Sequence, residues 1–87
     1  MIRIVDNAEV DERASIGEGS SIWHLAQIRE DAALGENCTV GRGAYVENQS
    51  TVGSFVKIES MAYIAAYSEI GDRAFVAAYP GSCGEGQ

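Results

Sequence analysis

The chain has 87 residues, enough for one domain, and carries a formal net charge of −7 at pH 7. So acidic a surface argues against nucleic acid as a partner, because phosphate backbones bind to basic side chains. The sequence shows neither an apolar run of membrane-spanning length nor the apolar core of a secretory signal peptide. We therefore expect no membrane insertion and a cytoplasmic location.

An aliphatic residue recurs at every sixth position from Ile4 to Val76, with a smaller side chain two positions before each one from Ala8 onward. A period of six fits neither an amphipathic helix nor a plain alternating strand. Hexapeptide repeats are typical of a parallel β-helix, in which short strands are joined by corners. Residues two apart in a strand point the same way, so both series should face the core. The aliphatic series is Ile4, Val10, Ile16, Ile22, Ile28, Leu34, Val40, Val46, Val52, Ile58, Ile64, Ile70 and Val76.

Four glycines that follow aliphatic residues lie 18 residues apart, at Gly17, Gly35, Gly53 and Gly71. Eighteen residues are three hexapeptides, so three short faces make one coil. We expect these glycines to stack along one corner, because glycine tolerates backbone angles that other residues resist. The prediction is an all-β solenoid of about four triangular coils over residues 1–79, followed by a flexible tail at 80–87.

Stacking at 18 residues also aligns outward side chains in columns. Asp11, Arg29 and Glu47 form a column of alternating charge, which predicts a ladder of ion pairs on the surface. Tyr45 and Tyr63 align in another column. Aromatic side chains gather in the later coils, which indicates an interface between subunits, and a domain this small is expected to oligomerise.

The two cysteines are not an obvious disulfide pair. Cys38 occupies an inward, small-residue position and should be a buried free thiol, whereas Cys83 lies in the tail. Free thiols are typical of cytoplasmic proteins.

The sequence resembles a known family over residues 14–57. The matching segments are 14–24, 26–30 and 34–46, which include an Ile-Trp-His element and a Gly-Glu-Asn-Cys run. They resemble the hexapeptide-repeat acyltransferase superfamily, most closely the bacterial sugar-nucleotide N-acetyltransferases of surface-polysaccharide synthesis. The resemblance implies a left-handed β-helix, a homotrimer and acetyl-CoA as co-substrate, bound in a groove between adjacent prisms. The reaction would acetylate an amino group on a nucleotide-linked sugar, without a metal.

The resemblance and the stacking together suggest catalytic and cofactor-binding residues. His24 would take the proton from the attacking amine, since histidine is the side chain that most often accepts a proton near neutral pH. Ser60 stands in the same column, where the family usually has an asparagine that helps to orient the amine. Arg42 and Lys57 are the nearest basic candidates for the phosphates of CoA. The structural alternative for His24 is a polar contact at a subunit seam.

Trp23 and Arg29 are the candidates for binding the sugar-nucleotide substrate. Trp23 lies beside His24 and could line the sugar site, or it could pack against a neighbouring subunit. Arg29 could engage a carboxylate or phosphate, or it could pair with Asp31 across subunits.

Two departures from the family keep a second function class open. The sequence has Glu59-Ser60-Met61 where the family usually carries a Gln-Asn pair, and relatives continue for several more coils and often a capping helix. Both favour a non-catalytic trimeric assembly or scaffold module derived from such a transferase. Two trimers stacked end to end would cover the open strand edges.

A third alternative is a γ-carbonic anhydrase-like protein, in which Ile-Trp followed by Ile-Arg-x-Asp also occurs. Such a protein needs three histidines around zinc, and this sequence has one.

Overall fold

The computed structural model describes residues 1–78, and these residues form a solenoid of short strands without a helix. Each strand is two residues long and ends on one of the aliphatic residues of the repeat. The strands are β1 (Arg3–Ile4), β2 (Glu9–Val10), β3 (Ser15–Ile16), β4 (Ser21–Ile22), β5 (Gln27–Ile28), β6 (Ala33–Leu34), β7 (Thr39–Val40), β8 (Tyr45–Val46), β9 (Thr51–Val52), β10 (Lys57–Ile58), β11 (Tyr63–Ile64), β12 (Glu69–Ile70) and β13 (Phe75–Val76).

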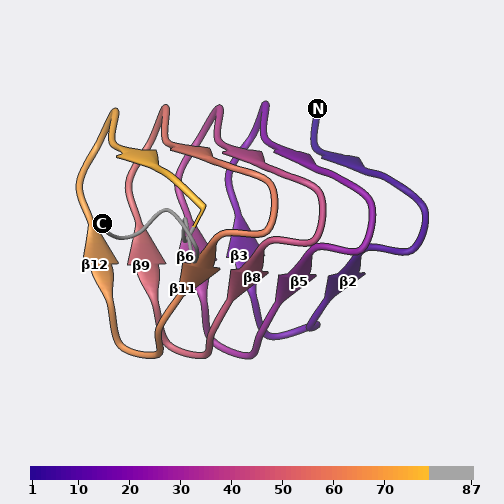
Figure 1. Cartoon of the computed structure of the whole chain (residues 1–87), viewed down its shortest axis with the longest axis horizontal. Coiled ribbons are helices and arrows are strands. Elements are labelled where there is room, and N and C mark those ends of the chain that lie inside the picture. Colours follow the sequence, from indigo (N-terminus) through magenta and orange to yellow (C-terminus); the bar gives the residue numbers. More distant parts are fainter. Residues whose placement is uncertain (79–87) are drawn as a thin grey trace, which may run out of the picture.

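Three parallel sheets form the walls of the solenoid (Figure 1). Sheet A has the order β1-β4-β7-β10-β13, sheet B has β11-β8-β5-β2, and sheet C has β12-β9-β6-β3. Every pairing joins residues 18 apart, as between Ile4 and Ile22 and between Ile22 and Val40. The all-β solenoid of about four coils is therefore confirmed, and the architecture is consistent with the left hand that the resemblance implies.

The core is the column of inward side chains enclosed by the three sheets. Ile22, Val40 and Ile58 stack in it on sheet A, and each is at most 1% exposed. The inward polar groups are satisfied by carbonyls of the next coil: the hydroxyl of Ser50 donates to Ala65 O at 2.8 Å. Cys38 is a buried free thiol, as expected, and its Sγ donates to Gly53 O at 3.0 Å.

The corners differ from the prediction, because left-handed backbone angles occur elsewhere than at the glycine column. They occur at the third residue after the aliphatic one, for example at Met61 with φ 65°. This conformation lets the amide of the corner residue bond to the preceding coil, as Met61 N does to Arg42 O at 2.8 Å. The residues with positive φ are Asn7, Gly19, Leu25, Asp31, Asn37, Gly43, Gln49, Phe55, Met61, Tyr67 and Arg73.

The column of glycines has a different physical cause, close approach between coils. None of its members has positive φ, so the predicted role in a strained corner was wrong. A Cβ on Gly35 would lie 2.7 Å from the carbonyl carbon of Gly53, and one on Gly17 would lie 2.5 Å from that of Gly35. Glycine is required there because the next coil's backbone occupies the space.

The end of the chain falls partly outside the described residues. Strand β13 ends at Val76, and Tyr79, the predicted tail at 80–87 and Cys83 lie beyond residue 78. No helix capable of crossing a membrane occurs in residues 1–78.

Candidate functional site

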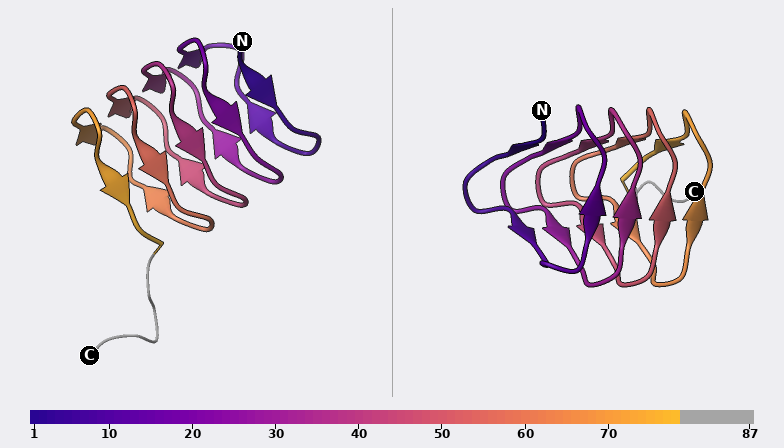
Figure 2. Two further views of the ribbon diagram at one scale, coloured as in Figure 1. Left: turned by 90° about the horizontal axis from the view of Figure 1, so that it is seen from above. Right: turned by 180° about the vertical axis from the view of Figure 1, so that it is seen from behind.

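The corner between sheets A and B carries most of the predicted site residues. We call it the first corner; it comprises residues 5–8, 23–26, 41–44 and 59–62 and recurs once per coil (Figure 2). His24, Arg42 and Ser60 occupy the same position in three successive coils, and all three are exposed. Strands of neighbouring coils are about 4.8 Å apart, so the backbones of His24 and Ser60 are separated by about 10 Å.

The imidazole of His24 is oriented by the coil before it. Its Nδ1 lies 3.1 Å from the backbone oxygen of Asp6. A carbonyl oxygen only accepts hydrogen bonds, so Nδ1 carries the proton in this contact. In the neutral ring Nε2 is then an acceptor, which is the state that a general base requires. Beside it, the guanidinium of Arg3 lies 6.0 Å from the ring centroid of Trp23.

Lys57 and Arg29 lie away from this column. Lys57 points outward from β10 on sheet A, just before the first corner, and is exposed. Arg29 follows β5 and therefore lies at the other end of sheet B from His24. Within residues 1–78 no side-chain hydrogen bond or ion pair joins the six predicted site residues to one another.

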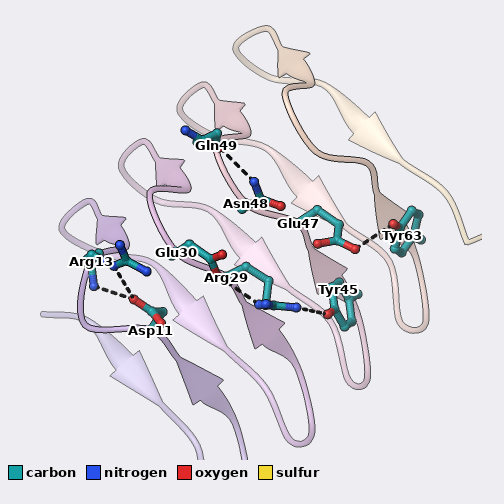
Figure 3. A network of polar contacts seen from close by, with 9 residues as sticks. All are labelled: Asp11, Arg13, Arg29, Glu30, Tyr45, Glu47, Asn48, Gln49 and Tyr63. Carbon is teal, nitrogen blue, oxygen red and sulfur yellow. Dashed lines mark hydrogen bonds and ion pairs between the residues drawn. The ribbon is translucent and has the colours of Figure 1, made fainter.

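Arg29 instead belongs to a polar network on the outer side of sheet B (Figure 3). Its Nη1 donates to the hydroxyl of Tyr45 at 2.6 Å, and its Nε donates to Oε1 of Glu30 at 3.2 Å. The hydrogen bond to Tyr45, together with the nearby Glu30 carboxylate, raises the pKa of Arg29. The guanidinium is thus held in one orientation by two partners.

The next coil repeats this arrangement with different residues. The hydroxyl of Tyr63 donates to Oε2 of Glu47 at 2.8 Å, which raises the pKa of Tyr63. The rings of Tyr45 and Tyr63 lie 5.6 Å apart between centroids, at an angle of 37°. The predicted alignment of these tyrosines in one column is confirmed.

The predicted ion-pair ladder of Asp11, Arg29 and Glu47 is not formed in residues 1–78. The three residues do stack, but each has another partner. Asp11 accepts a hydrogen bond from the backbone of Arg13 at 2.8 Å and forms an ion pair with that residue's side chain. Arg29 and Glu47 are each bound by a tyrosine hydroxyl of the following coil. Tyrosine reaches across the strand to the neighbouring column, which a ladder based on charge alone overlooks.

A depression on sheet B was not predicted. Its volume is about 350 Å³, and it lies over the first two strands of that sheet. The sequence signal that could have found it is a polar pair in each coil, two residues apart within the coil and 18 apart between coils. The lining residues are Glu9, Val10, Asp11, Gln27, Ile28 and Arg29.

Residues 1–78 contain no group of three or more His, Cys, Asp or Glu side chains placed to hold a metal ion. The sequence has a single histidine. We therefore carry no metal through the chemistry proposed below.

Comparison with known proteins identifies the repeat. Residues 13–48 match the family model described as bacterial transferase hexapeptide (six repeats). The acetyltransferase domain of PglB from Neisseria gonorrhoeae FA1090 is similar to the chain at 22% identity and a TM-score of 0.47. That match covers 92% of this chain but 56% of the other, so the chain spans little more than half of its length. No curated protein matches the sequence. The repeat matched by the family model is the one that winds the coils described above, and the chain belongs to the hexapeptide-repeat transferase superfamily.

Proposed function

We propose that this protein is an acetyl-CoA-dependent N-acetyltransferase that acts on an amino sugar nucleotide as a homotrimer. The observation that carries the proposal is the orientation of His24, in a chain whose repeats match a transferase family. Its Nδ1 is held by a backbone carbonyl, so the outer nitrogen is left as an acceptor on an exposed corner.

In the proposed reaction the substrate amine attacks the carbonyl carbon of the acetyl thioester. Nε2 of His24 takes a proton from the amine as the C–N bond forms. The C–S bond then breaks, and the CoA sulfur leaves as a thiol after receiving a proton. Ser60, two coils further along the same column, offers a hydroxyl that can orient the amine, although it is shorter than an asparagine.

The basic candidates would bind the cofactor. Arg42 lies one coil beyond His24 in the same exposed column, and Lys57 lies on the adjoining sheet. Phosphates accept charge-assisted hydrogen bonds from such side chains. Trp23 would line the sugar site, and Arg29 would contact an acidic group of the substrate. The groove itself would be completed by the neighbouring prism of the trimer.

Calorimetry with acetyl-CoA tests the cofactor part of the proposal. The expected result is binding in about the micromolar range, weakened by about tenfold or more in Arg42→Ala. The matched control is Arg13→Ala, which removes the same charge from the corner between sheets B and C and should bind normally. No binding at millimolar acetyl-CoA would contradict the proposal.

The rate of thiol release from acetyl-CoA in the presence of an amino sugar nucleotide tests the catalytic part. His24→Ala should lower the rate by about 10²–10⁴-fold, the usual contribution of a general base. Its affinity for acetyl-CoA should change little. An unchanged rate would show that His24 is not the base.

The second candidate function is a non-catalytic trimeric assembly module, and exposed apolar corners favour it. Phe55, Met61 and Tyr67 occupy the three corners of one coil, with exposed fractions of 53%, 69% and 71%. All three have positive φ, a conformation that costs about 1–2 kcal/mol outside glycine. Large apolar side chains at such costly positions are typical of contact surfaces. A stable trimer, or stacked trimers, without any acetyl-CoA binding would support this function over the enzyme.

The γ-carbonic anhydrase-like alternative is not proposed. It requires three histidines around zinc, and this chain supplies one.

A further inference from the structure

The depression on sheet B is bordered by polar side chains at four corners. Glu9 and Gln27 are register partners on β2 and β5. Asp11 and Arg29 follow two residues later in the same two coils and therefore point the same way. Coil spacing and strand rise place these four positions on a rectangle of about 5 by 7 Å. A volume of about 350 Å³ is at the lower end of the range for small-molecule sites.

One corner of this rectangle is a guanidinium that is already ordered. Arg29 uses one N–H on Tyr45 and one on Glu30, at 2.6 and 3.2 Å. An arginine has five N–H groups, so three are left to bind an anion. Tyr45 is in turn supported by the ring of Tyr63. Because the fork is held in place beforehand, a ligand does not have to pay for ordering it.

The opposite side of the rectangle is anionic. Glu9 is exposed on β2. One carboxylate oxygen of Asp11 accepts from the backbone of Arg13 at 2.8 Å, which leaves the other oxygen for a ligand. The amide of Gln27 can donate and accept between these charges. A purely anionic ligand would be repelled by the carboxylates, and a purely cationic ligand by the guanidinium.

We propose that this depression binds a small zwitterion the size of one sugar ring. A protonated amine would lie between Glu9 and Asp11, and a phosphate or carboxylate would lie on the free N–H groups of Arg29. The ring of Tyr45 would form the wall toward the third coil. This inference concerns binding alone and goes beyond the proposed function, because it stands whether or not the chain transfers an acetyl group.

Titrations of the full chain with matched probes test the inference by calorimetry and by amide chemical shifts. Glucosamine 6-phosphate carries both charges, glucose 6-phosphate lacks the amine, and glucosamine lacks the phosphate. We expect saturable binding of the first, with shifts centred on residues 9–11 and 27–29, and at least about tenfold weaker binding of the other two. 2-Amino-2-deoxyglucuronic acid, with a carboxylate in place of the phosphate, shows which anion the site prefers.

Variants with matched controls locate the site. Arg29→Ala and Glu9→Gln should each weaken the binding of glucosamine 6-phosphate by about tenfold. The controls are Arg73→Ala, at the corner between sheets C and A, and Glu69→Gln, at the equivalent outward position of β12. Both controls should bind like the unmodified chain. Thermal unfolding of every variant checks that the coils remain folded.

Tyr45→Phe tests the positioning role of the tyrosine. It keeps the ring but removes the hydroxyl that holds Arg29, so affinity for glucosamine 6-phosphate should fall severalfold while glucosamine binding stays the same. The proposal is overturned if no probe binds, or if glucose 6-phosphate binds as well as glucosamine 6-phosphate. It is also overturned if Arg29→Ala and Glu9→Gln change the sedimentation of the oligomer and leave probe binding intact, since sheet B would then be a subunit contact.

Discussion

Replacing Gly35 by alanine should destabilise the protein through a clash between coils. The new Cβ would lie 2.7 Å from the carbonyl carbon of Gly53 and 2.8 Å from its oxygen. These are backbone atoms, so no side-chain rotation relieves the contact. The second and third coils would have to separate by several tenths of an ångström, which lengthens the bond from Gly35 N to Val52 O, now 2.8 Å.

The expected magnitude follows from comparison with Gly71, the last glycine of the same column. A Cβ on Gly71 meets nothing within 4 Å, and its φ is not positive. Gly71→Ala should therefore be neutral or stabilise by up to about 1 kcal/mol, because alanine restricts the unfolded chain. Gly35→Ala should lower the free energy of unfolding by about 2 kcal/mol, as is typical of overpacking. In a domain of this size that corresponds to a Tm lower by about 8–16 °C.

Thermal and urea unfolding of the two variants at one protein concentration provide the assay. Both substitutions add the same methyl group in the same column, so side-chain chemistry cancels between them. Equal Tm values for Gly35→Ala and Gly71→Ala would refute the explanation by close approach of coils.

Two further predictions concern a corner and the tyrosine column. Tyr67 has φ 64° and is 71% exposed, so Tyr67→Gly should raise the free energy of unfolding by about 0.5–1 kcal/mol, whereas Asn7→Gly should change it little; a loss of stability in Tyr67→Gly would contradict this. The raised pKa of Tyr63 means that the folded state binds its proton more tightly than the unfolded state does. Its contribution to stability is full below the ordinary pKa of 10.0 and is lost as the pH rises through the higher folded value. Tm should therefore fall less steeply above pH 10 in Tyr63→Phe, and identical slopes would show that the bond to Glu47 has no such effect.

Most of the fold could be predicted because one physical rule repeats along the chain. The aliphatic residue at every sixth position determines which side faces inward, and 18-residue spacing sets the coil, so Ile22, Val40 and Ile58 stack as expected. The corner conformation could not be assigned in this way. Left-handed residues include Phe55 and Met61, which have no intrinsic preference for that conformation. They adopt it because their amides bond to the preceding coil, a tertiary requirement that residue type does not reveal.

The candidate site was predictable only as far as the columns. Register alone placed His24, Arg42 and Ser60 one above another. The contact from His24 to the Asp6 carbonyl depends on a particular corner geometry, and no sequence signal predicts it. The partner of Arg29 was missed for a similar reason, since its hydrogen bond runs to Tyr45 in the adjacent column. Reach across a strand depends on side-chain length and rotamer, which periodicity does not encode.

The winding at 18 residues per coil is the claim on which the site and both proposals depend, and an engineered disulfide tests it most directly. Ser21 and Thr39 are register partners on β4 and β7, at a spacing of about 4.8 Å, within the range of about 4.4–6.8 Å that a disulfide spans. In a background with Cys38→Ser and Cys83→Ser, the pair Ser21→Cys and Thr39→Cys should close into an intramolecular disulfide under mild oxidation, detected by mass spectrometry. The pair Ser21→Cys and Lys57→Cys spans two coils, about 10 Å, and should remain reduced. Failure of the first pair to close, or equal closure of both pairs, would contradict the coil.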